Sequence, residues 1–214
     1  MKPFGRYDTS ALEEAQFEAG SRGRVLKNLL GIKSKREMDK VEAREQLRAL
    51  DELVGIYGPS HRFTSADICK IHKIWLGSIY PWAGRYRRVN LSKGQFPFAA
   101  AGQIPGLMED FEKNFLYEYT PCNFKEIGKI IRAIAVVHTE LILIHSFRDG
   151  NGRGARLLSL LMALQAKFPP LDFTEIKGKK KEEYFAAVQA GMDRNYGPME
   201  KIFREVIDRT HSGE

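Results

Sequence analysis

The stretch from residue 124 to residue 143 constrains the fold more than any other part of the sequence, because it is apolar on almost every face. Its apolar residues recur at helical spacing, and toward the end they cover both faces. A helix that is apolar all round must be surrounded by other elements. We therefore expect a central buried helix. Its stripe consists of Ile127, Ile130, Ile131, Ile134, Val137, His138 and Leu141.

Most of the remaining chain also has helical patterning. A second apolar helix is expected after the glycine-rich stretch that follows the central one, and Pro169 and Pro170 end it. One stretch, residues 87–99, has β character, with a glycine-containing turn at Gly94 that favours a short hairpin. The fold class is therefore mainly α with one β-hairpin. The helices are expected at 35–56, 65–76, 103–119, 124–143, 153–166, 181–192 and 198–209.

Length and composition favour one globular domain. The chain has 214 residues, of which 43% are hydrophobic and 29% charged, close to the average of soluble domains. No apolar run is long enough to span a membrane, and the first residues hold no signal-peptide core. Cys69 and Cys122 are too few for a disulfide framework. We expect a cytoplasmic protein that has no membrane partner.

The net charge of +7 favours an anionic partner. A basic nucleic-acid-binding module is one interpretation of this charge, and the lysine-rich run at 177–181 supports it. A solvated loop explains the same run more simply. We do not expect nucleic acid to be the partner, and binding that weakens steeply with salt would be needed to support it.

The stretch 145–156, between the two most apolar helices, carries the chemistry. Gly150 and Gly152 leave backbone N–H groups uncovered, and a helix that begins near Asn151 directs its free N–H groups and its positive dipole end into the loop. Such a helix end binds anions. Arg153 and Arg156 lie on one face of its first turns, where cations are unfavourable unless a polyanion lies above them.

Two further side chains complete the pattern. Asp149 is a hard oxygen ligand beside the anion site, and one carboxylate with phosphate oxygens and waters is the usual magnesium arrangement. His145, at the end of the buried helix, can take a proton from an incoming hydroxyl. These groups are the ones that phosphoryl or nucleotidyl transfer requires.

The same stretch resembles the signature of the Fic family, His-x-Phe-x-(Asp/Glu)-Gly-Asn-Gly-Arg-x-x-Arg, and all its specified positions are filled. Residues 80–87 and 91–99 resemble the segment before the family's "flap" and the flap itself, and 25–32 resembles an N-terminal stretch of bacterial members. His138 fits the family's buried structural histidine. The resemblance implies a Fic-type helical domain at 21–205, with an extension at 1–20 and a tail at 206–214.

The resemblance further implies a protein adenylyltransferase that transfers AMP from ATP to a protein hydroxyl. His145 would be the general base and Asp149 would bind Mg²⁺. The phosphates would lie on the residues that follow, and the target protein would pair with the flap at 90–98. The implied nucleotide-binding residues are Gly150, Asn151, Gly152, Arg153, Arg156, Lys93, Gly94 and Tyr184.

The chain departs from the family at two positions. Ser146 replaces a common proline after the base. Eight residues after Tyr184, where some members have an asparagine that meets adenine, stands Met192. Transfer from another nucleotide, or another phosphoryl transfer, therefore stays open as an alternative.

Many members of the family are inhibited by a glutamate that pairs with the second arginine of the signature, here Arg156. The spacing of that motif occurs at 10–14 and 210–214, but in neither place is the motif complete. We therefore expect a separate small antitoxin to supply the glutamate, as in the family's toxin–antitoxin pairs.

Overall fold

The computed structural model describes residues 12–212, and the mainly α fold predicted from the sequence is confirmed. Within these residues one two-stranded antiparallel sheet is present. The elements are η1 (Glu13–Ala15), α1 (Lys35–Ile56), α2 (Ser65–Leu76), β1 (Ser92–Lys93), β2 (Phe96–Pro97), η2 (Ala101–Gln103), α3 (Ile104–Phe111), η3 (Glu112–Leu116), α4 (Tyr117–Tyr119), α5 (Ile127–Ile144), α6 (Asn151–Gln165), α7 (Lys179–Ala190), η4 (Gly191–Asp193) and α8 (Gly197–Ser212).

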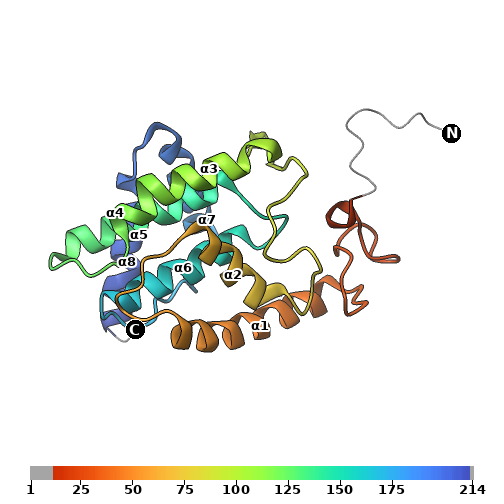
Figure 1. Ribbon diagram of the computed structural model, residues 1–214, viewed down its shortest axis with the longest axis horizontal. Helices are drawn as coiled ribbons and strands as arrows, with labels where there is room; N and C mark the ends of the chain where they lie inside the picture. The colour runs from red at the N-terminus through yellow and green to blue at the C-terminus, as the bar shows by residue number, and fades with distance from the viewer. Residues whose placement is uncertain (1–11, 213–214) are drawn as a thin grey trace.

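The apolar stripe forms α5, and the other helices pack around it. α6 and α8 have the most extensive contacts with α5, and α3 and α7 also touch it. α1 lies along the lower edge of the molecule in Figure 1 and packs against α2 and α6. The segment before α1 lies at one end of the molecule (Figure 1, red to orange). None of the helices in residues 12–212 is both long and apolar enough to cross a membrane.

The predicted hairpin is shorter than the β-like stretch. Only Ser92–Lys93 and Phe96–Pro97 pair as strands, and the Phe98 N–H donates to the Leu91 carbonyl just beyond them. The earlier part of the stretch bonds elsewhere: the Arg87 N–H donates to the Ser146 carbonyl and the Arg88 N–H to the Glu14 carboxylate. Tertiary partners therefore replace strand pairing there.

The segment 25–30 packs on the main body only in part. Val25 and Leu26 are buried, but Leu29 and Leu30 are 58% and 49% exposed. α8 runs through the boundary expected after residue 205, so the domain limits stay a prediction. Residues 10 and 214, which belong to the two incomplete inhibitory motifs, lie outside the described residues.

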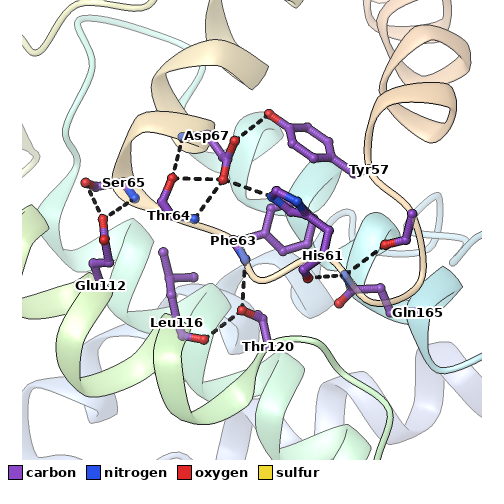
Figure 2. A network of polar contacts seen from close by, with 11 residues as sticks. Tyr57, His61, Phe63, Thr64, Ser65, Asp67, Glu112, Leu116, Thr120 and Gln165 are labelled. Atoms are coloured by element: carbon purple, nitrogen blue, oxygen red, sulfur yellow. Dashed lines mark hydrogen bonds and ion pairs between the residues drawn. The ribbon is translucent and has the colours of Figure 1, made fainter.

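A polar network fixes the start of α2 (Figure 2). Thr64 and Asp67 form a capping box, in which each side chain bonds the backbone N–H of the other. The Asp67 carboxylate also accepts from the Tyr57 hydroxyl at 3.1 Å and lies 3.0 Å from His61 Nε2. Burial acts to raise the pKa of Asp67, but these bonds from His61, Thr64 and Tyr57 outweigh it and hold that pKa below its usual value.

Asp67→Asn is expected to lower the free energy of unfolding by about 1–3 kcal/mol at pH 7, because the amide cannot accept all of these bonds. A carboxyl whose pKa is lower when folded stabilises the fold above its unfolded pKa, and this contribution is lost as the pH falls through the folded pKa. Urea unfolding at pH 7 and pH 3 should therefore show a gap between wild type and variant that narrows in acid.

The control is Asp39→Asn, since Asp39 is exposed and pairs only with Lys35 within the described residues; it should change stability little at either pH. A gap for Asp67→Asn that is unchanged at pH 3 would contradict the assigned role of the carboxylate charge.

Candidate functional site

A cleft of about 860 Å³ lies between the hairpin, the α5–α6 loop and α7. Most of the site residues predicted from the sequence line it, although they come from three separate parts of the chain. Its walls are formed by Leu91, Ser92, Lys93, Phe96, Phe98, Ile142, His145, Arg148, Asp149, Gly150, Asn151, Gly152, Arg153, Arg156, Lys181, Tyr184, Phe185, Val188 and Gln189.

Two left-handed residues shape the loop between α5 and α6. His145, the residue that follows α5, has a φ of 53°, and Gly150, the residue that precedes α6, has a φ of 82°. Gly150 is required there for a second reason: a Cβ would lie 2.9 Å from the ring of Trp75. The chain therefore reverses sharply and presents the start of α6 to the cleft.

Side chains beneath the loop hold this shape. The Asn151 amide accepts from the Phe147 N–H and donates to the Phe147 carbonyl, both at 2.8 Å. Phe147 is buried and stacks on His72 at 3.9 Å. His72 accepts from the Gly84 N–H through Nδ1, so its Nε2–H donates to the Asp149 carbonyl. Burial lowers the pKa of His72 to about 4 and keeps this bridge neutral.

His145 is arranged as a base. Its Nδ1 lies 3.1 Å from the Ile142 carbonyl, which can only accept, so Nδ1 carries the proton and Nε2 keeps its lone pair. The Phe98 ring stacks on the imidazole at 3.5 Å. Burial is the main reason that the His145 pKa falls to about 4, so the ring is neutral at physiological pH. The neighbouring Ser146 hydroxyl is buried and has no hydrogen-bond partner in the structure.

The start of α6 has no side-chain cap, and the first N–H groups of a helix have no partner within it. Arg156 lies one turn along, with its guanidinium over the Tyr184 ring. Its Nε is buried without a hydrogen-bond partner, and among the described residues no ion pair includes it. An uncapped helix end beside an arginine without a counter-ion is suited to a polyanion.

Arg153 differs from Arg156 because it has carboxylate partners. Its Nη1 lies 2.5 Å from the Glu42 carboxylate, and its Nη2 lies 3.7 Å from Asp149. Burial acts to lower the Arg153 pKa, but the charges of Glu42 and Asp149 raise it overall. The two arginines of the loop therefore differ: one has carboxylate partners and the other has none in the described part of the chain.

Arg87 joins the loop to the hairpin. It is 1% exposed, and within residues 12–212 its guanidinium donates only to backbone carbonyls. The acceptors are His145 at 2.7 Å, Val89 at 2.7 Å and Ala99 at 2.6 Å, with Ile144 more distant at 3.5 Å. One side chain thus fixes both bases of the hairpin to the end of α5. This residue positions His145 and Phe98 together.

The remaining predicted residues are placed as follows. Lys93 lines the cleft, with its Nζ 3.2 Å from the centre of the Phe185 ring. Tyr184 contributes its ring, since its hydroxyl donates to His138 at 2.6 Å. Gly94 lies at the hairpin turn and does not line the cleft. Met192 is 63% exposed and also lies outside it. That Lys93, Gly94 and Tyr184 bind nucleotide stays a prediction.

Four positioning residues could not be identified from local patterns: Glu42, His72, Arg87 and Phe98. Glu42 and His72 lie within stretches that the sequence predicts only as helices, at 35–56 and 65–76. Their roles depend on contacts with residues as far as 111 positions away in the chain, which no local pattern reports. For Arg87 the sequence offers one signal: alternation in the β-like stretch places it on the same face as the apolar Val89 and Leu91.

Glu14, the glutamate of the first incomplete inhibitory motif, is also placed. Its carboxylate accepts from the Arg88 N–H at 2.7 Å, and its carbonyl accepts from the Arg148 Nε at 2.8 Å. It therefore joins the segment before α1 to the hairpin and the loop. No ion pair in the described residues links it to Arg156.

Residues 62–163 match the Fic/DOC family model. Curated relatives named protein adenylyltransferase include Fic from Nematostella vectensis, 30% identical over 71% of this chain, and fic-1 from Caenorhabditis elegans, 30% identical over 96% of it. The chain covers 34% and 39% of their lengths, so it spans about a third of such relatives. The solved Fic domain of a VirB-translocated Bep effector protein from Bartonella quintana, with bound ADP, is 25% identical. It superposes with a TM-score of 0.70 over 91% of this chain and 94% of that one.

Arg87→Met is expected to lower the free energy of unfolding by about 3 kcal/mol, because buried carbonyls lose their donor. The loss should be concentrated at the hairpin, so amide exchange at the Phe98 N–H should quicken more than exchange within α5. Arg85→Met is the matched control, since Arg85 is exposed and, in the part of the chain that the structure describes, donates only to the Pro81 carbonyl; it should change stability by less than about 0.5 kcal/mol. Equal protection of the Phe98 N–H from exchange in both variants would contradict the role of Arg87 in holding the hairpin on α5.

Proposed function

Because the chain contains a domain of the Fic/DOC family, at residues 62–163, we propose that it transfers AMP from ATP to a hydroxyl side chain of a target protein. One observation carries the proposal: the free Nε2 of His145 and the guanidinium of Arg156, which has no carboxylate partner among the described residues, line a single cleft with the uncapped start of α6. A base and a polyanion site are thereby brought together. The names of the curated relatives support the same chemistry.

In the proposed reaction the target hydroxyl oxygen attacks the α-phosphorus of ATP. The hydroxyl proton passes to His145 Nε2. The bond between the α-phosphorus and the oxygen that bridges it to the β-phosphorus breaks, and pyrophosphate leaves. AMP stays on the target through a new phosphodiester bond. The protein contributes mainly position and charge, as is usual for transfer at phosphorus.

The phosphates would lie on the N–H groups of Gly150, Asn151 and Gly152, with Arg153 and Arg156 on the β- and γ-phosphates. Both polar atoms of the Asn151 side chain already bond Phe147, so its backbone is the part best placed to serve an anion. Lys93, Gly94 and Tyr184 would bind the nucleotide from the other walls.

The cleft can hold Mg²⁺ through a single protein carboxylate, that of Asp149. In the described residues no cluster of three or more acidic, histidine or cysteine side chains could hold a metal alone. Asp149 lines the cleft and its side chain is 44% exposed. A single carboxylate suits Mg²⁺, which takes its other ligands from phosphates and waters. When bound, the ion would neutralise phosphate charge during transfer.

The hairpin would hold the target segment at residues 90–98 by main-chain pairing, as an added strand. We further propose that the chain is the toxin of a bacterial toxin–antitoxin pair and acts in the cytoplasm. The absence of a carboxylate on Arg156 among the described residues supports an inhibitory glutamate that comes from a separate small antitoxin.

The test uses the purified chain with Mg²⁺ and ATP labelled at either the α- or the γ-phosphate, in a bacterial lysate. We expect the α-label on a discrete protein band, and its loss in His145→Ala. ATP binding by that variant should persist, since the phosphate site does not include the imidazole. Transfer of the γ-label alone would contradict AMP transfer and favour a kinase. If neither label moves, other nucleotides and a copurifying small protein are the next measurements.

The rate should depend on pH in an unusual way. A histidine pKa lowered to about 4 keeps the base neutral at every pH above about 5. The acid limb of kcat/KM for α-label transfer should therefore fall near pH 4–5, in place of the usual value near 6.5. Initial rates between pH 4.5 and 8 measure it, with ATP affinity at each pH as the control. A half-maximal rate near pH 6.5 at unchanged ATP affinity would contradict a buried, neutral base.

A further inference from the structure

Glu42 belongs to α1, yet its carboxylate contacts the first arginine of the loop. The residue is only 1% exposed, and both of its oxygens are bonded. Oε2 accepts from Arg153 Nη1 at 2.5 Å, and Oε1 accepts from the Tyr80 hydroxyl at 2.7 Å. Its carbonyl accepts from Trp75 Nε1 at 2.9 Å, which ties this turn of α1 to α2. The carboxylate therefore has a fixed place with complete bonding.

This carboxylate approaches Arg153 from behind. Arg153 and Asp149 line the cleft, whereas Glu42 does not. A glutamate that inhibits by occupying a phosphate position would have to lie inside the cleft. Glu42 therefore leaves the cleft face of the guanidinium free, and its effect must come through the arginine.

Arg153 has one competing partner. Its Nη2 already lies 3.7 Å from the Asp149 carboxylate, one helical turn before it, and the Trp75 ring lies 4.8 Å from its guanidinium carbon. The Arg153 side chain is 31% exposed, so without Glu42 its partly buried guanidinium would turn further toward the nearest carboxylate, because a charge shielded from water is costly without a close partner. The present 3.7 Å contact would then become a close pair between the phosphate-binding arginine and the proposed metal ligand.

We propose that Glu42 is a positioning residue that holds Arg153 apart from Asp149, so that Arg153 can bind the terminal phosphates of a nucleoside triphosphate while Asp149 stays open to a cation. The proposal rests on the proposed function, since it takes the loop to be a triphosphate site. It assigns to α1 a part in ligand binding, through a residue that does not touch the ligand.

The test compares the affinities of the full chain for ATP and for AMP, by calorimetric titration without metal. AMP lacks the phosphates that Arg153 would hold, so the ratio of the two affinities isolates that contact. Glu42→Met fills the same space but accepts no hydrogen bond. It should lower the ratio by about 10-fold or more, the value of a charge-assisted bond, and leave the affinity for AMP within about 2-fold.

Glu42→Gln is the conservative variant, because its amide oxygen can still accept from Arg153. A neutral acceptor is weaker than a charged one, so the ratio should fall by only about 3-fold. If Glu42→Met does not fold, the affinity ratio of Glu42→Gln tests the proposal on its own. Glu52→Met is the matched control: Glu52 is on the same helix, 47% exposed and paired with Arg48. It should leave the ratio unchanged.

Different results would overturn the proposal in distinguishable ways. A general structural role for Glu42 would weaken ATP and AMP equally, and an inhibitory role would tighten ATP binding in Glu42→Gln; either result overturns it. A wild-type chain that binds ATP no better than AMP would overturn both this proposal and the assignment of the phosphate site. A large wild-type ratio that survives in Glu42→Met would overturn the role of Glu42 alone.

Discussion

The site depends on one buried guanidinium. Arg87 donates to the carbonyl of His145 at one end of α5 and to Val89 and Ala99 at the two bases of the hairpin. A left-handed residue at the end of a helix leaves its carbonyl without a helical partner, and the arginine supplies one. The same contacts set the distance between His145 and the Phe98 ring that covers it. The hairpin has only two residues in each strand, so its position follows from this clamp far more than from strand pairing.

Burial gives the histidines of the site their roles. His72, His138 and His145 all have pKa values lowered to between about 3 and 4, chiefly by burial. Each is therefore neutral and has one donor and one acceptor nitrogen. In His72 and His138 both nitrogens are bonded, so these two act as fixed struts under the loop and under Tyr184. In His145 only Nδ1 is bonded in the described structure, which leaves one nitrogen for chemistry. A histidine of this site is thus a structural residue when the fold gives both ring nitrogens a hydrogen-bond partner, and it can act as a base when one nitrogen has none.

The helices and the loop could be predicted from local patterns, and the site's supports could not. The stripe in 124–143 is wide enough to require a central helix, and Thr64 with Asp67 forms a capping box that fixes the start of α2. The loop was predictable because glycines, arginines and a histidine in a short stretch restrict what the backbone and its charges can do. By contrast, the β-like stretch around Arg87 forms few hydrogen bonds between strands, because its backbone N–H groups donate to the α5–α6 loop and to Glu14. Periodicity describes one element at a time, and these partners belong to other elements.

The two arginines at the start of α6 show why position in a motif does not determine electrostatic role. Arg153 has a buried carboxylate behind it and a second one at 3.7 Å, so most of its charge is balanced within the protein. Arg156 has aromatic rings beside it and no carboxylate partner among the described residues. Of the two arginines, Arg156 therefore contributes more to the field that an incoming polyanion meets, together with the uncapped helix end, while Arg153 is already oriented by its carboxylate partners. A guanidinium that is already oriented loses little side-chain freedom when it binds phosphate. Arg153 can therefore favour correct alignment of the phosphates, while Arg156, whose charge has no carboxylate partner in the described residues, contributes more of the attraction.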